Sequence, residues 1–240
     1  MTLDWAACAF IMAAASLVLG LAGFGNALVA MAFLPYFMPP ATAIAVLTIY
    51  TIVFAIAIFV PVRHHLAPRG VAYLLVGTVV GTPLGVWILV TVSASTLNRI
   101  IGATLVVVVL LEWVGVYPER LTGRRWSIGA GLFAGVAGGA VGMPGPPVVV
   151  YSTTQGWSAQ TIKANLQVFF FVNQAVILAG YWWAGLLTRE VWRLSASFAL
   201  PAAAGTALGI LLFTRVDHAR FRQVVFAVLL VSGIILLTRG

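Results

Sequence analysis

The chain has 240 residues, of which 62% are hydrophobic and only 8% are charged. Soluble domains carry about 25% charged residues, so this composition argues against an ordinary soluble protein. The formal net charge is +8. Most of the basic residues fall in or beside short connections between apolar runs, which is typical of a membrane protein and not of nucleic-acid binding. Cys8 is the single cysteine, so an intrachain disulfide is excluded.

Eight apolar segments follow one another, long enough to cross a hydrocarbon core about 30 Å thick. They predict an all-α polytopic membrane protein. The first segment would measure about 48 Å as one helix at 1.5 Å per residue, which is too long for one ordinary span. The predicted segments are residues 5–36, 41–61, 70–91, 97–117, 127–151, 161–187, 191–213 and 219–238.

Two glycine-rich breaks interrupt the apolar runs at matching places, in Gly20–Asn26 and in Gly138–Pro147. Aligning Gly20 with Gly139 gives an offset of 119 residues. A backbone that leaves the helix at membrane depth is tolerated only where it is buried in protein or lines a watery cavity. Paired breaks in the two halves of a chain therefore point to the substrate site of a transporter, built from broken or re-entrant helices.

The repeat continues beyond the breaks, because Gly81–Gly85 matches Gly205–Gly209 at an offset of 124. We therefore expect one membrane domain over residues 1–240, with residues 1–118 and 126–240 as two homologous halves. Four spans in each half would make the halves parallel, whereas one extra crossing in each would invert them. The charges of the connections leave both arrangements and the membrane orientation open.

The two breaks are expected to face each other across an anion pocket. A half-helix that begins inside the protein presents free N–H groups and the positive end of its dipole to a ligand. The alternative is a packing kink without a ligand, since small residues also let helices approach closely. The predicted substrate-binding residues are Gly23, Gly25, Asn26, Thr48, Gly142, Met143, Gly145, Lys163, Asn165 and Gln167.

Polar side chains recur in the segment after the second break, where Asn173 and Gln174 follow the residues named above. Lys163, Gln167 and Gln174 lie four and seven residues apart, so they share one helical face. A central lysine costs about 2.5–3.5 kcal/mol on insertion scales and usually faces the bundle interior, where it would complement an anion. The alternative is that Lys163 lies at the membrane boundary and reaches water.

Sequence motifs of enzymes are missing: there is no Gly-x-Ser-x-Gly, no His-Glu-x-x-His and no Walker-type phosphate loop. We therefore expect no enzymatic activity, no metal and no cofactor. Glu112 lies within a predicted span and can either carry a coupling proton or reach the interface. The alternatives to a carrier are a non-transporting membrane subunit or permease partner of a larger complex, and a channel, for which a filter repeat is missing.

With these features the chain resembles the TauE/SafE family of sulfite and organosulfur anion permeases, from about Leu17 to Leu237. The resemblance implies a secondary carrier of the bacterial inner-membrane type that moves sulfite, a sulfonate or a related organosulfur compound. Such a carrier needs no ATPase subunit. The sequence leaves the coupling ion and the oligomeric state open, with a proton and a homodimer as the alternatives considered. The residues that carry it are Gly20–Asn26, Pro35, Pro39–Pro40 before Ala45, Gly135–Pro147 and Lys163–Asn165.

The chain departs from the family pattern at both breaks. The family tends to have a run of three glycines where Gly25 is here followed by Asn26 and Ala27. In the second half, Met143–Pro147 contains prolines where glycines are common. We expect substrate choice to depend on this difference between the breaks.

Overall fold

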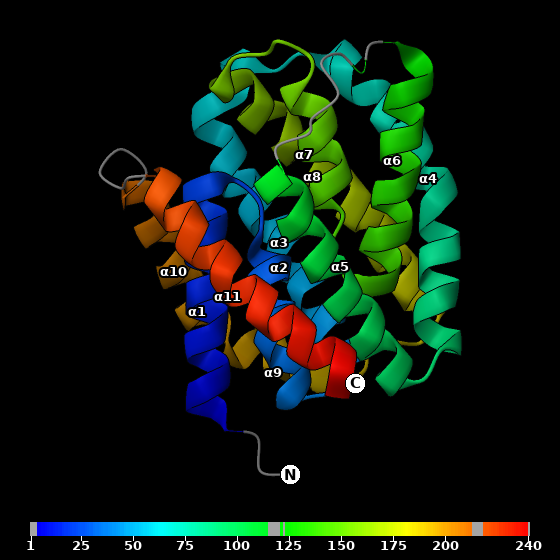
Figure 1. Cartoon of the computed structure of the whole chain (residues 1–240), viewed down its shortest axis with the longest axis vertical. Helices are drawn as coiled ribbons and strands as arrows, with labels where there is room; N and C mark the ends of the chain where they lie inside the picture. Colours follow the sequence, from blue (N-terminus) through cyan, green and yellow to red (C-terminus); the bar gives the residue numbers. More distant parts are fainter. Residues whose placement is uncertain (1–3, 115–120, 122, 213–217, 240) are drawn as a thin grey trace. The chain divides into compact units, whose positions relative to one another are not determined.

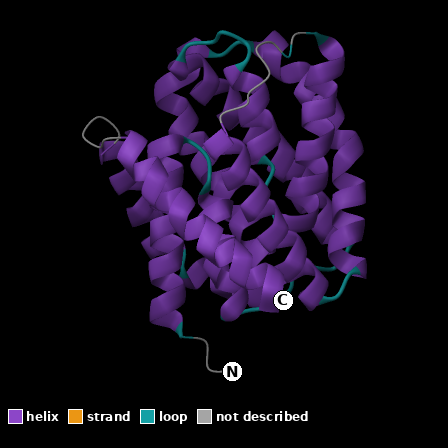
Figure 2. Ribbon diagram, viewed as in Figure 1, coloured by secondary structure: helices purple, strands orange, loops and turns teal. Residues whose placement is uncertain are grey.

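The computed structural model describes residues 4–114, 121, 123–212 and 218–239. Helices fill most of these residues, and no strand occurs among them (Figure 2), so the predicted all-α class is confirmed. The helices are α1 (Trp5–Ala22), α2 (Asn26–Phe33), α3 (Pro40–Val62), α4 (Pro68–Thr91), α5 (Ala94–Val114), α6 (Arg124–Val141), α7 (Gly145–Thr153), α8 (Ala159–Trp183), α9 (Arg189–Ser197), α10 (Ala199–Leu212) and α11 (His218–Arg239), with 3₁₀ turns η1 (Leu34–Tyr36) and η2 (Arg63–His65) (Figure 1).

Five helical stretches among the described residues are long and apolar enough to cross a membrane: α1, α3 with η2, α4, α5 and α8. A sixth is the pair α9 and α10, which is bent by 50° at its junction. The expected count of eight segments is not confirmed. Segments 5–36 and 127–151 each consist of a long helix followed by a short one, because a glycine break divides them.

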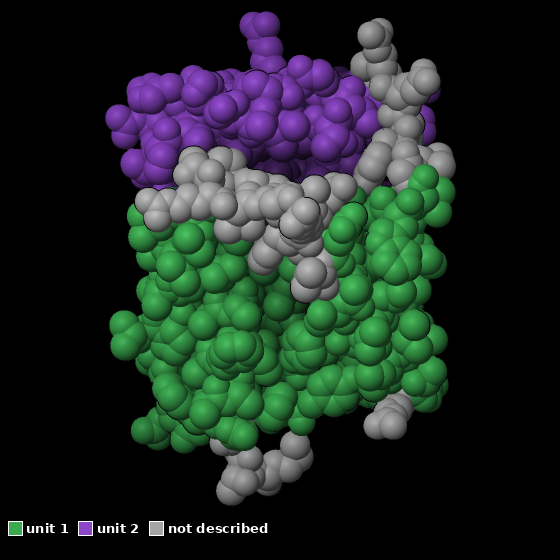
Figure 3. Space-filling model, turned by 60° about the vertical axis from the view of Figure 1, so that its left-hand side comes forward, with its two compact units in different colours: residues 1–47, 92–116, 189–240 green, residues 48–91, 117–188 purple. Residues whose placement is uncertain are grey.

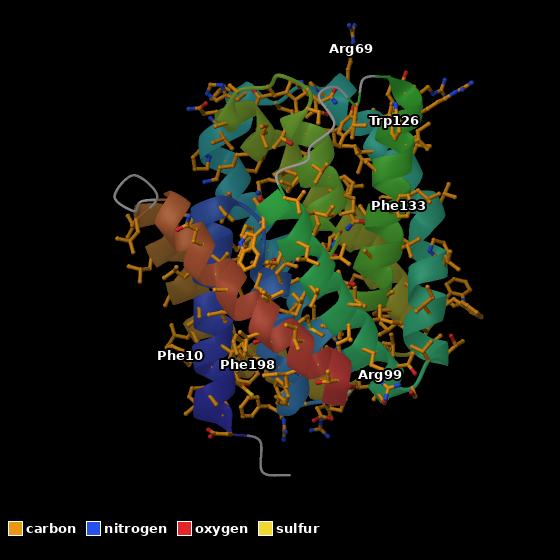
Figure 4. The ribbon with its side chains drawn as sticks, in the orientation of Figure 1. Phe10, Arg69, Arg99, Trp126, Phe133 and Phe198 are labelled. Atoms are coloured by element: carbon orange, nitrogen blue, oxygen red, sulfur yellow. The ribbon has the colours of Figure 1, made fainter. Side chains whose placement is uncertain are left out.

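Large apolar side chains project from several helices. Phe10 on α1 is 75% exposed, and Phe133 and Trp126 on α6 are 68% and 57% exposed (Figure 4). Many large apolar side chains exposed on helices are unusual for a soluble monomer, and exposed tryptophans near helix ends are typical of membrane proteins. Together with the apolar helices, these side chains indicate a multi-pass membrane protein.

The chain forms two compact units, which Figure 3 shows in two colours. Unit 1 comprises Met1–Leu47, Val92–Val116 and Arg189–Gly240, and unit 2 comprises Thr48–Thr91 and Tyr117–Thr188. Each unit takes segments from both predicted halves, so the units cut across the sequence boundary between the halves. The division into two homologous halves stays a prediction.

In unit 1, α1 packs along α10 through glycines. A Cβ atom on Gly209 would lie 2.9 Å from the Cα atom of Gly20 and would overlap the carbonyl oxygen of Leu17. A Cβ on Gly205 would likewise overlap the carbonyl oxygen of Ala13. Glycine is required here because the two backbones lie in contact.

In unit 2, α4 packs along α6 in the same manner (Figure 1). A Cβ atom on Gly85 would lie 2.9 Å from the Cα atom of Gly139. Gly85 is the sequence partner of Gly209, and Gly139 is the partner of Gly20. The repeated glycines thus form equivalent close contacts in the two units, and each contact joins a helix from the first half to a helix from the second.

The short helices after the breaks are held inside their own units. In unit 1, α2 packs against α1, α5 and α11, and α5 crosses α11 where a Cβ on Gly102 would lie 2.6 Å from the carbonyl oxygen of Gly233. In unit 2, α7 packs against α6 and α8. Each break is therefore enclosed by neighbouring helices.

Candidate functional site

The two breaks have the same local structure. α1 is capped by Gly23 at φ 80°, and α6 is capped by Gly142 at φ 73°. Both lie in the left-handed region, where glycine is favoured because it has no Cβ. A short helix begins three residues after each cap, α2 in unit 1 and α7 in unit 2. The predicted helix breaks are therefore present at both places.

The first break offers several backbone donors at the start of α2. The amide of Gly23 is used by the α1 cap, since it donates to a carbonyl of α1 at 2.7 Å. The amides of Gly25, Ala27 and Leu28 have no acceptor among the described residues. Asn26 is 7% exposed at the first position of α2. The sequence motif alone did not indicate Ala27 and Leu28 as donors. The amides in the first turn of a helix lack an intrahelical partner, so these donors could be named only once the first residue of α2 was known.

The second break uses two of its amides to cap α6. The amide of Gly142 donates to the carbonyl of Gly138 at 3.0 Å, and the amide of Met143 donates to the carbonyl of Ala137 at 3.2 Å. These bonds satisfy carbonyls that the end of the helix would otherwise leave without partners. The expectation that these two amides are presented to an anion is therefore corrected: both bond to α6.

Prolines reduce the donors of α7 further. Pro144, Pro146 and Pro147 carry no N–H group. The amide of Gly145 remains, and no described group accepts a hydrogen bond from it. The backbone at the start of α7 is thus poorer in donors than that at the start of α2, so an anion at the second break needs donors from side chains.

A buried tyrosine fixes the end of α6 to α8 and α3. The Tyr181 hydroxyl donates to the carbonyl oxygen of Gly139 at 2.9 Å and lies 3.4 Å from that of Gly138. It is also hydrogen-bonded to the side chain of Thr48. The Gly139 carbonyl needs this partner, because the amide four residues later, that of Met143, is bonded elsewhere. Thr48, a predicted binding residue, is thereby linked to the second break.

Tyr181→Phe is expected to destabilise the protein by about 1–2 kcal/mol, because a buried carbonyl then lacks its hydroxyl donor. Denaturant or thermal unfolding of the purified protein in detergent measures the loss. Tyr151→Phe is the matched control: Tyr151 is also buried, its ring contacts Trp157, and its hydroxyl has no partner among the described residues. Equal stability of the two variants would show that the Tyr181 hydroxyl does not support the break.

The other predicted side chains all lie on α8. Lys163 is half-buried in the second turn of α8. This position near the start of the helix also fits the alternative that Lys163 lies at the membrane boundary. Asn165 is 2% exposed, and its Oδ1 accepts from the amide of Ala67 at 2.9 Å, which ties α8 to the turn before α4. Gln167 is 1% exposed. These burials are compatible with a binding role, which stays a prediction.

Two elements of the prediction keep that status. The first break belongs to unit 1 and the second to unit 2, and their facing each other across one pocket remains an expectation. Glu112 lies in α5, half-buried, and its coupling role is likewise a prediction. Among the described residues, no group of three His, Cys, Asp or Glu side chains is placed to hold a metal ion.

Comparison with protein families matches residues 8–236 of the chain to the family described as Sulfite exporter TauE/SafE. The match covers nearly the whole chain, including both breaks and all the candidate residues. No curated protein and no solved structure is found to match.

Proposed function

Because the chain belongs to the sulfite exporter TauE/SafE family, we propose that it is a secondary carrier of a small anion. The substrates proposed are sulfite, a sulfonate or a related organosulfur compound. The location proposed is a bacterial inner membrane. Apolar helices long enough to cross a membrane support a membrane-embedded carrier.

The observation that carries the proposal is the repeated break. At each break, a glycine in the left-handed region ends one helix and a short, enclosed helix begins three residues later. At the start of each short helix, backbone amides lack an acceptor among the described residues. A helix N-terminus with unused amides favours an anion, through its hydrogen-bond donors and its dipole. Lipid cannot satisfy such amides, so a polar ligand or water is needed there.

The binding residues proposed are those predicted from the sequence, except that the amides of Gly23, Gly142 and Met143 bond to the preceding helix and so line the breaks without donating to the anion. Gly25 and Asn26 would act together with the amides of Ala27 and Leu28 at the first break. Gly145 would act at the second. Lys163, Asn165 and Gln167 would add charge and hydrogen bonds, and Thr48 would act through its bond to Tyr181.

Transport would proceed by alternating access, with one body of the protein rocking against another around the site. α1 and α10 are in backbone contact at glycines, and so are α4 and α6. Each pair is therefore expected to move together, and each moving body would contain helices from both halves of the sequence.

Uptake into proteoliposomes tests the proposed function. Labelled sulfite, a sulfonate, sulfate and a non-sulfur carboxylate are compared, each with and without a proton gradient. We expect faster uptake of a sulfur anion than into protein-free vesicles, and an effect of the gradient if a proton is coupled. No transport of any of these anions would contradict the carrier and favour a non-transporting subunit of a larger complex.

A further inference from the structure

A buried stripe runs along α8 at a spacing of four residues, so its members share one face of the helix. Its polar members contact three different neighbours: the turn before α4, α4 itself and the end of α6. Every side chain in the stripe is at most 2% exposed. The stripe consists of Asn165, Phe169, Asn173, Ile177 and Tyr181.

Asn173 is the middle residue of this stripe and is fully buried. Its Oδ1 accepts a hydrogen bond from the Thr78 hydroxyl of α4 at 2.7 Å. Its Nδ2 carries two hydrogens and has no partner among the described residues. Because the hydroxyl of Thr78 is the donor in this bond, it fixes which end of the carboxamide faces away from α4.

That free end lies beside the second break. A Cβ atom built on Gly138 would stand 3.4 Å from Nδ2 of Asn173, 3.0 Å from Cβ of Pro144 and 2.8 Å from Cδ1 of Ile177. Gly138 belongs to the last turns of α6, and Pro144 is the residue before α7. Asn173 therefore places its Nδ2 beside the last turns of α6, close to the break where the backbone of unit 2 is poor in donors.

A buried donor without a partner destabilises a protein by about 1–3 kcal/mol, so each such group in a native structure needs an explanation. The low local dielectric that makes the donor costly also strengthens its bond to a charged acceptor. An oxyanion has several acceptor oxygens and no donor, so it matches a carboxamide whose acceptor end is already occupied.

We propose that Asn173 is an anion-binding residue, which donates from Nδ2 to an oxygen of the sulfur oxyanion at the second break. Gly145 adds its backbone amide at the start of α7. Thr78 is a positioning residue, because it holds the carboxamide with its donor end toward the anion. This inference rests on the proposed function and adds to it a binding residue and its support.

The test measures sulfite binding to the full-length protein in nanodiscs by calorimetry, with sulfate and methanesulfonate as further probes. Asn173→Leu removes the donor at similar volume and is expected to weaken sulfite binding about ten- to a hundredfold, as for a lost hydrogen bond to a charged group. Thr78→Val removes the orienting hydroxyl and is expected to weaken binding about three- to tenfold. Thr78→Ser keeps the hydroxyl and is expected to retain the affinity.

Thr82→Val is the matched control. Thr82 is equally buried one turn further along α4, and its hydroxyl bonds the carbonyl of Thr78 in the same helix, not Asn173. Thr82→Val is expected to bind sulfite like the wild type. The contrast between valine and serine at Thr78 is a readout that loss of packing alone would not produce.

Unchanged sulfite affinity in folded Asn173→Leu would overturn the inference while leaving the proposed function intact, and would assign Nδ2 to a bound water. If Asn173→Leu does not fold, Thr78→Val decides, and wild-type affinity in that variant contradicts the positioning role. A wild-type protein that binds none of the three anions overturns the proposed function, and the role of Asn173 with it.

Discussion

Gly131→Leu is expected to prevent accumulation of folded protein. Gly131 lies where α6 touches α4, and a Cβ atom there would overlap the carbonyl oxygen of Leu74 and stand 2.8 Å from its carbonyl carbon. The clash is with backbone, so no rotamer change relieves it, and the helices must separate along the crossing. Adding methylenes to a packed core typically destabilises a protein by about 1–3 kcal/mol. Here a whole leucine side chain is added against backbone, so the loss of folding stability is expected to be at least that large.

Gly129→Leu is the matched control for this substitution. Gly129 lies two residues earlier on the same helix, and nothing is within 4 Å of its Cβ position. Both substitutions replace glycine by the same side chain and improve intrinsic helix propensity equally. Size-exclusion chromatography in detergent compares the yields of monodisperse protein. Similar yields of the two variants would contradict the close contact between α4 and α6.

The second large effect is expected on anion affinity. Asn26→Ala and Lys163→Ala should each weaken sulfite binding about tenfold, as for a lost hydrogen bond to a charged group, without loss of folded protein. Asn26 is buried at the first position of α2, and Lys163 is half-buried near the start of α8. Lys163→Ala removes a positive charge, so its effect should be larger on divalent than on monovalent anions.

Conservative variants separate these roles from packing. Lys163→Arg keeps the charge and is expected to bind sulfite within about threefold of the wild type, since affinity follows charge unless one donor geometry is required. Calorimetry with sulfite and methanesulfonate gives the affinities. Unchanged affinity in both Asn26→Ala and Lys163→Ala would place the anion site elsewhere, and Lys163 would then be a boundary residue.

The sequence was sufficient for the helix breaks and for the spacing of the packing glycines. Gly23 and Gly142 lie in glycine-rich runs that interrupt otherwise apolar segments, and each caps a helix at a positive φ, which glycine adopts readily. Gly81 and Gly85 lie four residues apart and therefore on one helix face, a spacing typical of close helix packing. Both are local patterns, which a sequence displays directly.

The donors at the breaks could not be deduced in the same way. The Met143 amide bonds to α6 because that helix ends just before it. A shift of one or two residues in the helix end would change which amides are used, and sequence patterns do not predict helix ends that accurately. The bond from Tyr181 to Gly139 joins residues 42 positions apart, and that from Thr78 to Asn173 joins residues 95 apart. Such contacts depend on how the helices pack.

The compact units were also beyond the reach of the sequence. The repeat offsets predict two halves in succession, whereas α1 is in contact with α10 and α4 with α6. A duplicated sequence defines equivalent segments but not which copy each segment packs against. The equivalence of the contacts at Gly20 with Gly209 and at Gly139 with Gly85 supports the proposed duplication.

The central claim, that the chain is a carrier for a sulfur oxyanion, is tested most directly by counterflow. Proteoliposomes are loaded with unlabelled sulfite and diluted into a trace of labelled sulfite. An alternating-access carrier exchanges the two, so we predict a transient accumulation of label inside above its outside concentration. Entry of label without this overshoot would indicate a channel, and no entry above that of protein-free vesicles would contradict transport of sulfite by this protein.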